Sequence, residues 1–113
     1  MSPADHRVDL LYGTLDLLIL RTLVYGPSHG HAIARYVRHV SEDALRIETG
    51  SLYPALHKLE GRGWIAAEWK KSDKGKRARY YRLTLTGRKQ LALQQSRWEQ
   101  LAVAMARVLR PAD

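Results

Sequence analysis

Three side chains in one short segment have the residue types of a hydrolytic triad. Ser51, His57 and Glu60 supply a hydroxyl, an imidazole and a carboxylate. A nucleophile and its general base must lie within hydrogen-bond reach of each other. Residues six positions apart on one helix do not face each other, so Ser51 and His57 would not meet. The chain also lacks a glycine-rich phosphate loop and a nucleophile elbow. The sequence therefore predicts that this protein is not an enzyme.

Histidine is the second residue type that could take part in chemistry, and four of the five histidines lie at positions 29, 31, 39 and 57. His29 and His31 are two residues apart, whereas helical zinc ligands are spaced i, i+4. The chain contains no cysteine to complete a zinc site. We expect no metal and no cofactor, and a surface or capping role for His29 and His31.

Positive charge is concentrated in one short segment. Residues 70–82, KKSDKGKRARYYR, hold seven Lys/Arg and one Asp, which gives +6 of the net +8. Such a concentration favours contact with a polyanion. A lysine-rich solvated loop would have the same composition, so charge alone leaves both interpretations open.

Length and composition are those of one domain, or of one domain with an appendage. The chain has 113 residues, of which 45% are hydrophobic. The N-terminal stretch has no basic region followed by a long apolar run, since Asp9 and Asp16 interrupt it. We expect no signal peptide, no membrane span and a cytoplasmic location.

Apolar spacing indicates helices along the first half of the chain. We expect a short helix before Gly13, then a buried helix over 15–25 with Thr14 as its N-cap. Ser28 is the expected cap of the next helix, 29–40.

In that helix Ile33, Val37 and Val40 follow the i, i+4, i+7 spacing of a buried face. Alternation around Leu45 and Ile47 predicts a short strand.

A third helix is expected over about 50–62. Leu52, Leu56 and Leu59 define its buried face. Proline is tolerated in the first turn, where backbone N–H groups have no partner, so Pro54 places the helix start near Gly50 or Ser51. Thr49 or Ser51 would cap it, and the GRG sequence at 61–63 would end it, with either Gly61 or Gly63 in a left-handed conformation.

The hydrophobic period then changes from 3.6 to 2. Residues 64–84 predict a β-hairpin with a long basic tip, in which Ile65, Ala67 and Trp69 share one face. A final helix opens at Thr84 or Thr86 and runs to about Arg110. Its apolar residues follow an a/d pattern, interrupted by Gln94.

This order of elements is that of a winged helix-turn-helix: mostly α, with a small β-hairpin and a long C-terminal helix. We expect a DNA-binding domain over 1–84 and a dimerisation helix over 85–113. In such a fold the third helix enters the major groove and the hairpin reaches the flanking backbone or minor groove. The candidate DNA-binding residues are Ser28, Thr49, Ser51, Tyr53, His57, Lys58, Lys71, Lys74, Lys76, Arg77 and Arg79.

Several of these residues have a second interpretation. Lys58 could instead pair with a nearby acid, and Ser28, Thr49 and Ser51 could act only as helix caps. Either Arg77 or Arg79 could enter a narrow minor groove.

Four stretches resemble the PadR family of transcriptional regulators. They are GTLDLLILRTL at 13–23, HG before AIA at 29–34, ALRIETGSLYPALHKLEGRGWIAAEW at 44–69 and RARYYRLTLTGRKQL at 77–91. The single C-terminal helix is similar to that of the shorter PadR subgroup. His31 departs from the pattern, because the family commonly has Tyr after HG.

The resemblance implies a homodimeric repressor that binds a roughly palindromic operator on double-stranded DNA. It also implies a dimer interface formed by the C-terminal helix with help from the N-terminal segment. The residues expected there are Leu10, Leu11, Leu91, Trp98, Leu101, Met105 and Val108. Some family members are released from DNA by small aromatic or hydrophobic compounds.

Trp98 therefore has two possible roles: it packs across the dimer seam, or it borders a cavity for a flat aromatic effector. A winged helix can also act as a protein-interaction module without DNA specificity. The basic hairpin favours the DNA-binding function.

Overall fold

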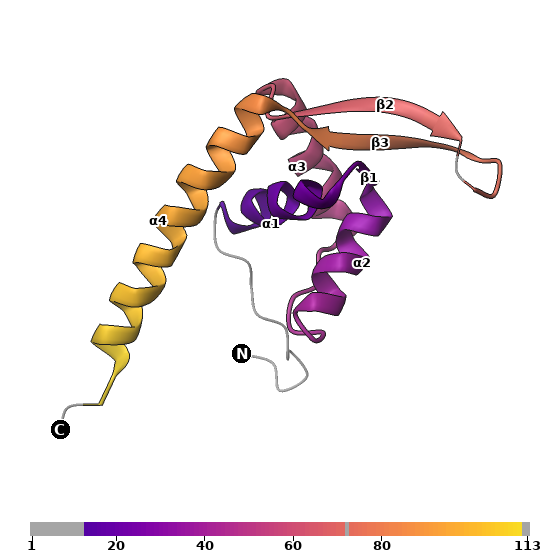
Figure 1. Cartoon of the computed structure of the whole chain (residues 1–113). Helices are drawn as coiled ribbons and strands as arrows, with labels where there is room; N and C mark the ends of the chain where they lie inside the picture. Colours follow the sequence, from indigo (N-terminus) through magenta and orange to yellow (C-terminus); the bar gives the residue numbers. More distant parts are fainter. Residues whose placement is uncertain (1–12, 72, 112–113) are drawn as a thin grey trace.

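The computed structural model describes residues 13–71 and 73–111. It is a winged helix-turn-helix, mostly α with a small antiparallel sheet, and its long last helix extends away from the body (Figure 1). The elements in order are α1 Thr14–Thr22, the 3₁₀ turn η1 Leu23–Tyr25, β1 Ser28–His29, α2 Gly30–Val40, α3 Thr49–Gly61, β2 Ile65–Lys71, β3 Arg77–Leu83 and α4 Leu85–Leu109.

Helix α1 lies in the centre of the core because it has apolar residues on nearly every side. Ile19 and Leu20 are fully buried. The expected cap at Thr14 is wrong: Gly13 is the N-cap residue, with a left-handed φ of 88°, and Thr14 is the first helical residue. The helix also ends earlier than expected, since its last turn tightens into η1. The expected helix before Gly13 lies outside the described residues, as do Leu10 and Leu11.

Helix α2 buries the face that contains Ile33 and Val37. Its cap differs from the expectation: the side chain of His29, not Ser28, accepts a hydrogen bond from the backbone N–H of Ala32 at 3.2 Å. Ser28 instead belongs to β1, where it pairs with Tyr81 of β3. Val40 is largely exposed, because the core ends one turn before the helix does.

Residues 41–44 form a turn and residues 45–48 have no regular structure, so the expected strand around Leu45 and Ile47 is wrong. Glu42 and Asp43 both take positive φ values, 53° and 71°. Asp43 pairs with Arg38 and Arg46, and the hydrogen bond from Arg38 is the main reason that the pKa of Asp43 is lowered. The turn is therefore held by local ion pairs, and sheet pairing goes to β1.

Helix α3 buries Leu52, Leu56 and Leu59, as the sequence predicts. It starts earlier than expected, with Glu48 as N-cap and Thr49 as its first residue. Pro54 therefore lies beyond the first turn and removes the backbone hydrogen bond that the carbonyl of Gly50 would otherwise accept.

The C-terminal end of α3 matches the GRG prediction. Gly63 takes φ 76°, its N–H bonds to the carbonyl of Glu60, and the N–H of Trp64 bonds to that of Leu59. This is a Schellman motif, which turns the chain directly into β2.

The sheet has the order β1-β3-β2, with both pairs antiparallel. Ile65 faces Leu83 at the base of the hairpin, and Lys71 faces Arg77 near its tip. Ile65, Tyr81 and Leu83 are buried, so the base of the hairpin belongs to the core. Beyond it the hairpin extends as a wing.

Helix α4 begins as predicted at Thr84, whose hydroxyl accepts a hydrogen bond from the N–H of Gly87 at 3.0 Å. The helix packs tightly against the residue that precedes β2: a Cβ on Gly87 would lie 1.9 Å from the carbonyl oxygen of Trp64. In the described part of the chain, no helix combines the length and apolar character needed to cross a bilayer.

Candidate nucleic-acid interface

The outer face of α3 is the first component of the site. Because the helix buries one leucine stripe, it exposes Gly50, Tyr53, Pro54 and His57. Tyr53 and His57 therefore face outward, as expected. Gly50 and Pro54, which the sequence indicated only as residues of the helix start, share this face. Gly50 has no side chain and Pro54 has a compact ring, so a duplex groove can approach the backbone closely along the N-terminal half of α3.

Tyr53 is not a free side chain, although it is 40% exposed. Its ring lies against the first residue of α2, where a Cβ on Gly30 would meet the Tyr53 hydroxyl at 2.9 Å. This contact explains the glycine of the HG sequence and brings the Tyr53 hydroxyl to the N-terminus of α2. Ser28 and the capping His29 lie at the same helix start.

His29 also contacts the sheet. Its ring meets that of Tyr80 edge-on, with 5.5 Å between centroids. The helix cap and the ring contact together give His29 the capping role expected from the sequence. Thr49 and Ser51 are exposed at the start of α3, where Glu48 makes no side-chain cap.

Lys58 differs from the other candidates on α3. Its ammonium lies 2.7 Å from a carboxylate oxygen of Asp16, whose side chain is buried at the start of α1. Of the two interpretations of Lys58, the structure contains the ion pair, and the acid is Asp16. The pair fastens α3 to α1, and the charge of Lys58 is balanced within the protomer.

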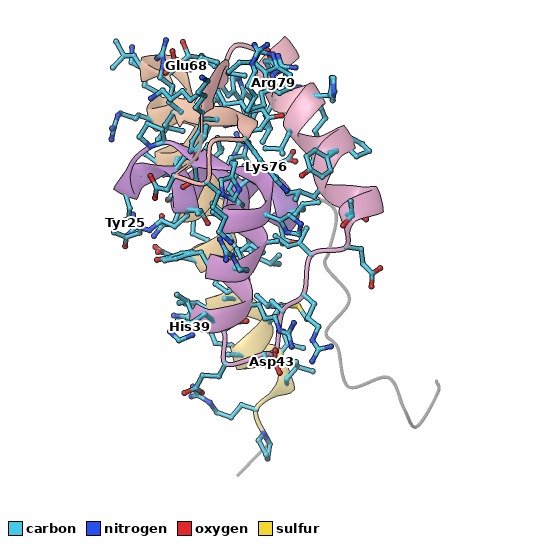
Figure 2. All side chains as sticks on the ribbon, turned by 90° about the vertical axis from the view of Figure 1, so that its right-hand side faces the viewer. Tyr25, His39, Asp43, Glu68, Lys76 and Arg79 are labelled. Carbon is cyan, nitrogen blue, oxygen red and sulfur yellow. The ribbon has the colours of Figure 1, made fainter. Side chains whose placement is uncertain are left out.

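The wing is the second component of the site. Its cations Lys71, Lys74, Lys76 and Arg77 are all exposed along the hairpin tip. They stay in water because the core ends near the base of the hairpin. Figure 2 shows Lys76 in the wing, with Tyr25 and His39 on the side away from α3.

Arg79 does not fit the expectation of a free DNA-contacting arginine. Its Nη2 donates to an oxygen of Glu60 at the end of α3, at 2.7 Å. Its Nε is buried and has no hydrogen-bond acceptor among the described residues. Arg79 therefore links the wing to α3 through this ion pair. Its position on the α3 side in Figure 2 agrees with that role.

Helix α4 supplies an apolar stripe outside the core. Trp98, Leu101, Met105 and Val108 are all exposed in the protomer. Leu91 is a correction to the expected interface: it is buried in the protomer core, so it has little surface left for a partner. A cavity of about 160 Å³ lies between the start of α1 and α4, with Leu17, Gln94 and Trp98 among its lining residues.

An exposed helix face, a basic wing beside it and an ion pair that joins them define a winged-helix DNA-binding protein. The family model described as the transcriptional regulator PadR-like family matches residues 19–93, from α1 into α4. The chain belongs to this PadR-like family, as the resemblance of its sequence indicated. It is therefore a DNA-binding transcriptional regulator and not an enzyme.

Solved structures of such regulators are similar over most of the chain. A transcriptional regulator from Clostridium thermocellum has a TM-score of 0.79 and 28% identity, over 87% of this chain and 95% of that one. A PadR family transcription regulator from Clostridium difficile has a TM-score of 0.75 and 29% identity, over 87% of this chain and 100% of that one. Transcriptional regulator Rv3488 of Mycobacterium tuberculosis is 37% identical over 65 residues, which are 58% of this chain and 60% of that protein.

Proposed function

We propose that this regulator is a homodimeric repressor that binds a roughly palindromic operator. The observation that carries the proposal is the apolar stripe of α4, where Trp98 is 46% and Met105 50% exposed in a single protomer. A helix about 38 Å long that leaves such a stripe in water is incompletely buried unless another chain covers it. A second copy offers the same stripe, as a two-fold interface requires.

Two-fold symmetry then explains the palindrome. A dimer places two copies of α3 in successive major grooves, about 34 Å apart, when its operator contains two inverted half-sites. Each α3 would present Tyr53 and His57 to the groove, with Thr49 and Ser51 at its start. The 1–84 unit would bind DNA, and the helix of 85–113 would set the spacing.

Phosphate contacts supply most of the affinity in this proposal. The Tyr53 hydroxyl and the N-terminus of α2 lie together, and helix N-termini favour phosphate oxygens. The wing cations Lys71, Lys74, Lys76 and Arg77 add further contacts. Six to ten such contacts per dimer would lower the affinity roughly 10³–10⁵-fold between 50 and 200 mM salt.

Repression follows from occupancy, because a dimer that covers two turns of promoter DNA excludes other proteins from it. Release by a small aromatic or hydrophobic compound is the finer part of the proposal, with Trp98 and its cavity as the contact. We place this activity in the cytoplasm, where the chromosomal partner is.

The test begins with a gel shift on random-sequence duplex at low salt, followed by selection of bound sequences from a random pool. We expect a shift, inverted-repeat sequences in the selected pool, and lower expression of a reporter whose promoter contains the selected site. A chain that shifts no duplex at low salt would be a protein-interaction module instead. Selected sites without inverted symmetry would contradict the dimeric operator.

A further inference from the structure

The wing contains an exposed tryptophan whose ring is contacted by two arginines. Trp69 lies on the same face of β2 as Ile65 and Ala67, but it is 58% exposed because the strand extends past the core. Arg79 is its direct partner across the hairpin, and Arg77 is the diagonal one. The guanidinium carbons lie 6.0 and 5.4 Å from the indole centroid, within the range of cation–π contacts.

The two arginines differ in what else they bind. Arg79 is held by Glu60 of α3, and the side chains of both are about one-third exposed. Arg77 is exposed, and none of the ion pairs found within residues 13–71 and 73–111 involves it. Glu60, Arg79, Trp69 and Arg77 thus form a continuous chain of contacts from the end of α3 to the tip of the wing.

We propose that Trp69 is a positioning residue for DNA recognition, because its indole holds Arg77 in place to enter the minor groove beside the major-groove site. In this arrangement Arg79 does not contact bases: together with Glu60 it fixes the wing against α3. The inference rests on the proposed function and assigns separate roles to the two arginines of the wing.

The physical reason lies in how arginine loses freedom on binding. A long, flexible side chain loses rotamer entropy when it enters a groove. A guanidinium already held against an indole has lost part of that freedom before DNA arrives, and its N–H donors stay available to an acceptor. A narrow A·T-rich minor groove has enhanced negative potential and attracts arginine in particular. Lysine is a less suitable substitute, because its ammonium is more strongly hydrated and has no planar face.

The test uses the duplex selected from the random pool, in two versions whose flanks outside the α3 contacts are all A·T or all G·C. Wild type is expected to bind the A·T-flanked duplex more tightly. Arg77→Lys keeps the charge, and we expect it to lose most of this preference. Lys74→Ala is the matched control: it should weaken binding to both duplexes equally. An unchanged flank preference in Arg77→Lys would overturn the minor-groove role.

Trp69 is tested by replacement with and without a ring. Trp69→Val retains a good strand former but removes the platform, and we expect about 2- to 5-fold weaker binding per wing to the A·T-flanked duplex. Trp69→Tyr should restore most of the affinity and the flank preference. Combined with Arg77→Lys, Trp69→Val should add little further loss, since both changes remove the same contact.

Two outcomes separate this inference from the proposed function. If wild type shifts no duplex, the proposed function fails before the wing is tested. If wild type binds its selected site, but Trp69→Val and Trp69→Tyr bind alike, the platform role fails and the proposed function stands. Thermal unfolding of each variant, followed by circular dichroism, shows whether a loss of binding comes from a loss of fold.

Discussion

Single contacts decide which residues of this protein are available to DNA. Lys58 and Arg79 have the same charge as the residues of the wing tip, but each is bound to a carboxylate of another element, Asp16 and Glu60. Tyr53 is partly covered by α2 at Gly30. Residue type alone would have placed all three at the DNA surface without restraint.

The ion pair between Lys58 and Asp16 leads to a prediction about stability. Lys58→Met leaves the buried carboxylate of Asp16 without its ammonium, so we expect the free energy of unfolding to fall by about 1–2 kcal/mol. Urea denaturation measures it. Lys74→Met, at an exposed position of the wing, is the control and should have no effect. Equal midpoints for the two variants would show that the pair contributes nothing.

The contact between Gly30 and Tyr53 leads to a prediction about affinity. Gly30→Ala puts a methyl group 2.9 Å from the Tyr53 hydroxyl and displaces the ring toward solvent. If that hydroxyl binds phosphate, affinity for the selected duplex should fall about 2- to 10-fold, the range of one hydrogen bond. Tyr53→Phe should cause a similar loss, and the double variant little more. Additive losses would mean that the two residues act separately.

At the scale of elements, two joints orient the parts of the molecule. The wing is joined to α3 through Glu60 and Arg79. Helix α4 is joined to the wing through Thr84, whose N–H donates to the carbonyl of Trp64 and whose hydroxyl lies 2.7 Å from the carbonyl oxygen of Gly63 and 3.0 Å from that of Trp64. These contacts lie between elements whose faces would meet DNA and a partner chain. The relative orientation of α3, the wing and α4 therefore depends on a few residues.

The α4 joint is tested at Gly87. Replacing glycine by alanine within a helix normally stabilises it by about 0.5–1 kcal/mol. Here the added Cβ would lie 1.9 Å from a backbone oxygen, which no side-chain rotation can relieve. We expect Gly87→Ala to destabilise the protein by about 1–3 kcal/mol, measured by thermal or urea unfolding. Gly61→Ala, where a Cβ meets nothing within 4 Å, is the control and should be neutral or stabilising.

The wing is tested by removing its charge. Lys74, Lys76 and Arg77 changed together to Ala should weaken binding to every duplex. The slope of log affinity against log salt should become shallower by as much as about 5, because a dimer loses six cations that contact DNA. Filter binding over a salt series measures both. Lys89, Arg107 and Arg110 changed to Ala remove the same charge from α4 and its C-cap, and they should leave the slope nearly unchanged. A loss confined to the selected operator would mean that the wing reads sequence.

At the scale of the whole molecule, the apolar stripe of α4 extends beyond the core. The helix reaches away from the winged domain, while the wing extends in another direction (Figure 1). The domain between them packs its apolar side chains into its own core, which includes residues from Ile19 to Leu91. Assembly through α4 would therefore leave α3 and the wing of each protomer accessible.

Trp98→Asp tests that assembly. A carboxylate in the middle of an apolar seam would lose its hydration on association, so we expect the variant to sediment as a monomer. Ser96→Asp places the same charge on another face of the helix, and it should leave the dimer intact. A dimer that survives Trp98→Asp would place the interface elsewhere. A monomeric variant should also bind its operator more weakly, since it engages one half-site at a time.

Local patterns in the sequence determined much of this protein. The buried leucines of α3, the glycine that ends it and the Thr84 cap each depend on residues within a few positions of one another, and the hairpin depends on two alternating runs joined by one polar, glycine-containing segment. Periodicity and turn chemistry are therefore sufficient to predict them. The basic wing tip is also visible in composition, because those residues are contiguous.

Only the tertiary structure decided which distant groups meet. Ser28 pairs with Tyr81, Lys58 with Asp16 and Glu60 with Arg79, and no local pattern encodes these partners. The predicted strand near Leu45 and the predicted cap at Ser28 are wrong for this reason. The edge of β3 that β2 leaves open pairs with β1, which contains Ser28. Leu91 continues the same heptad as Trp98, and only the place where the core ends separates a core residue from an exposed one. Spacing along a helix defines a face, whereas the neighbouring elements decide what covers it.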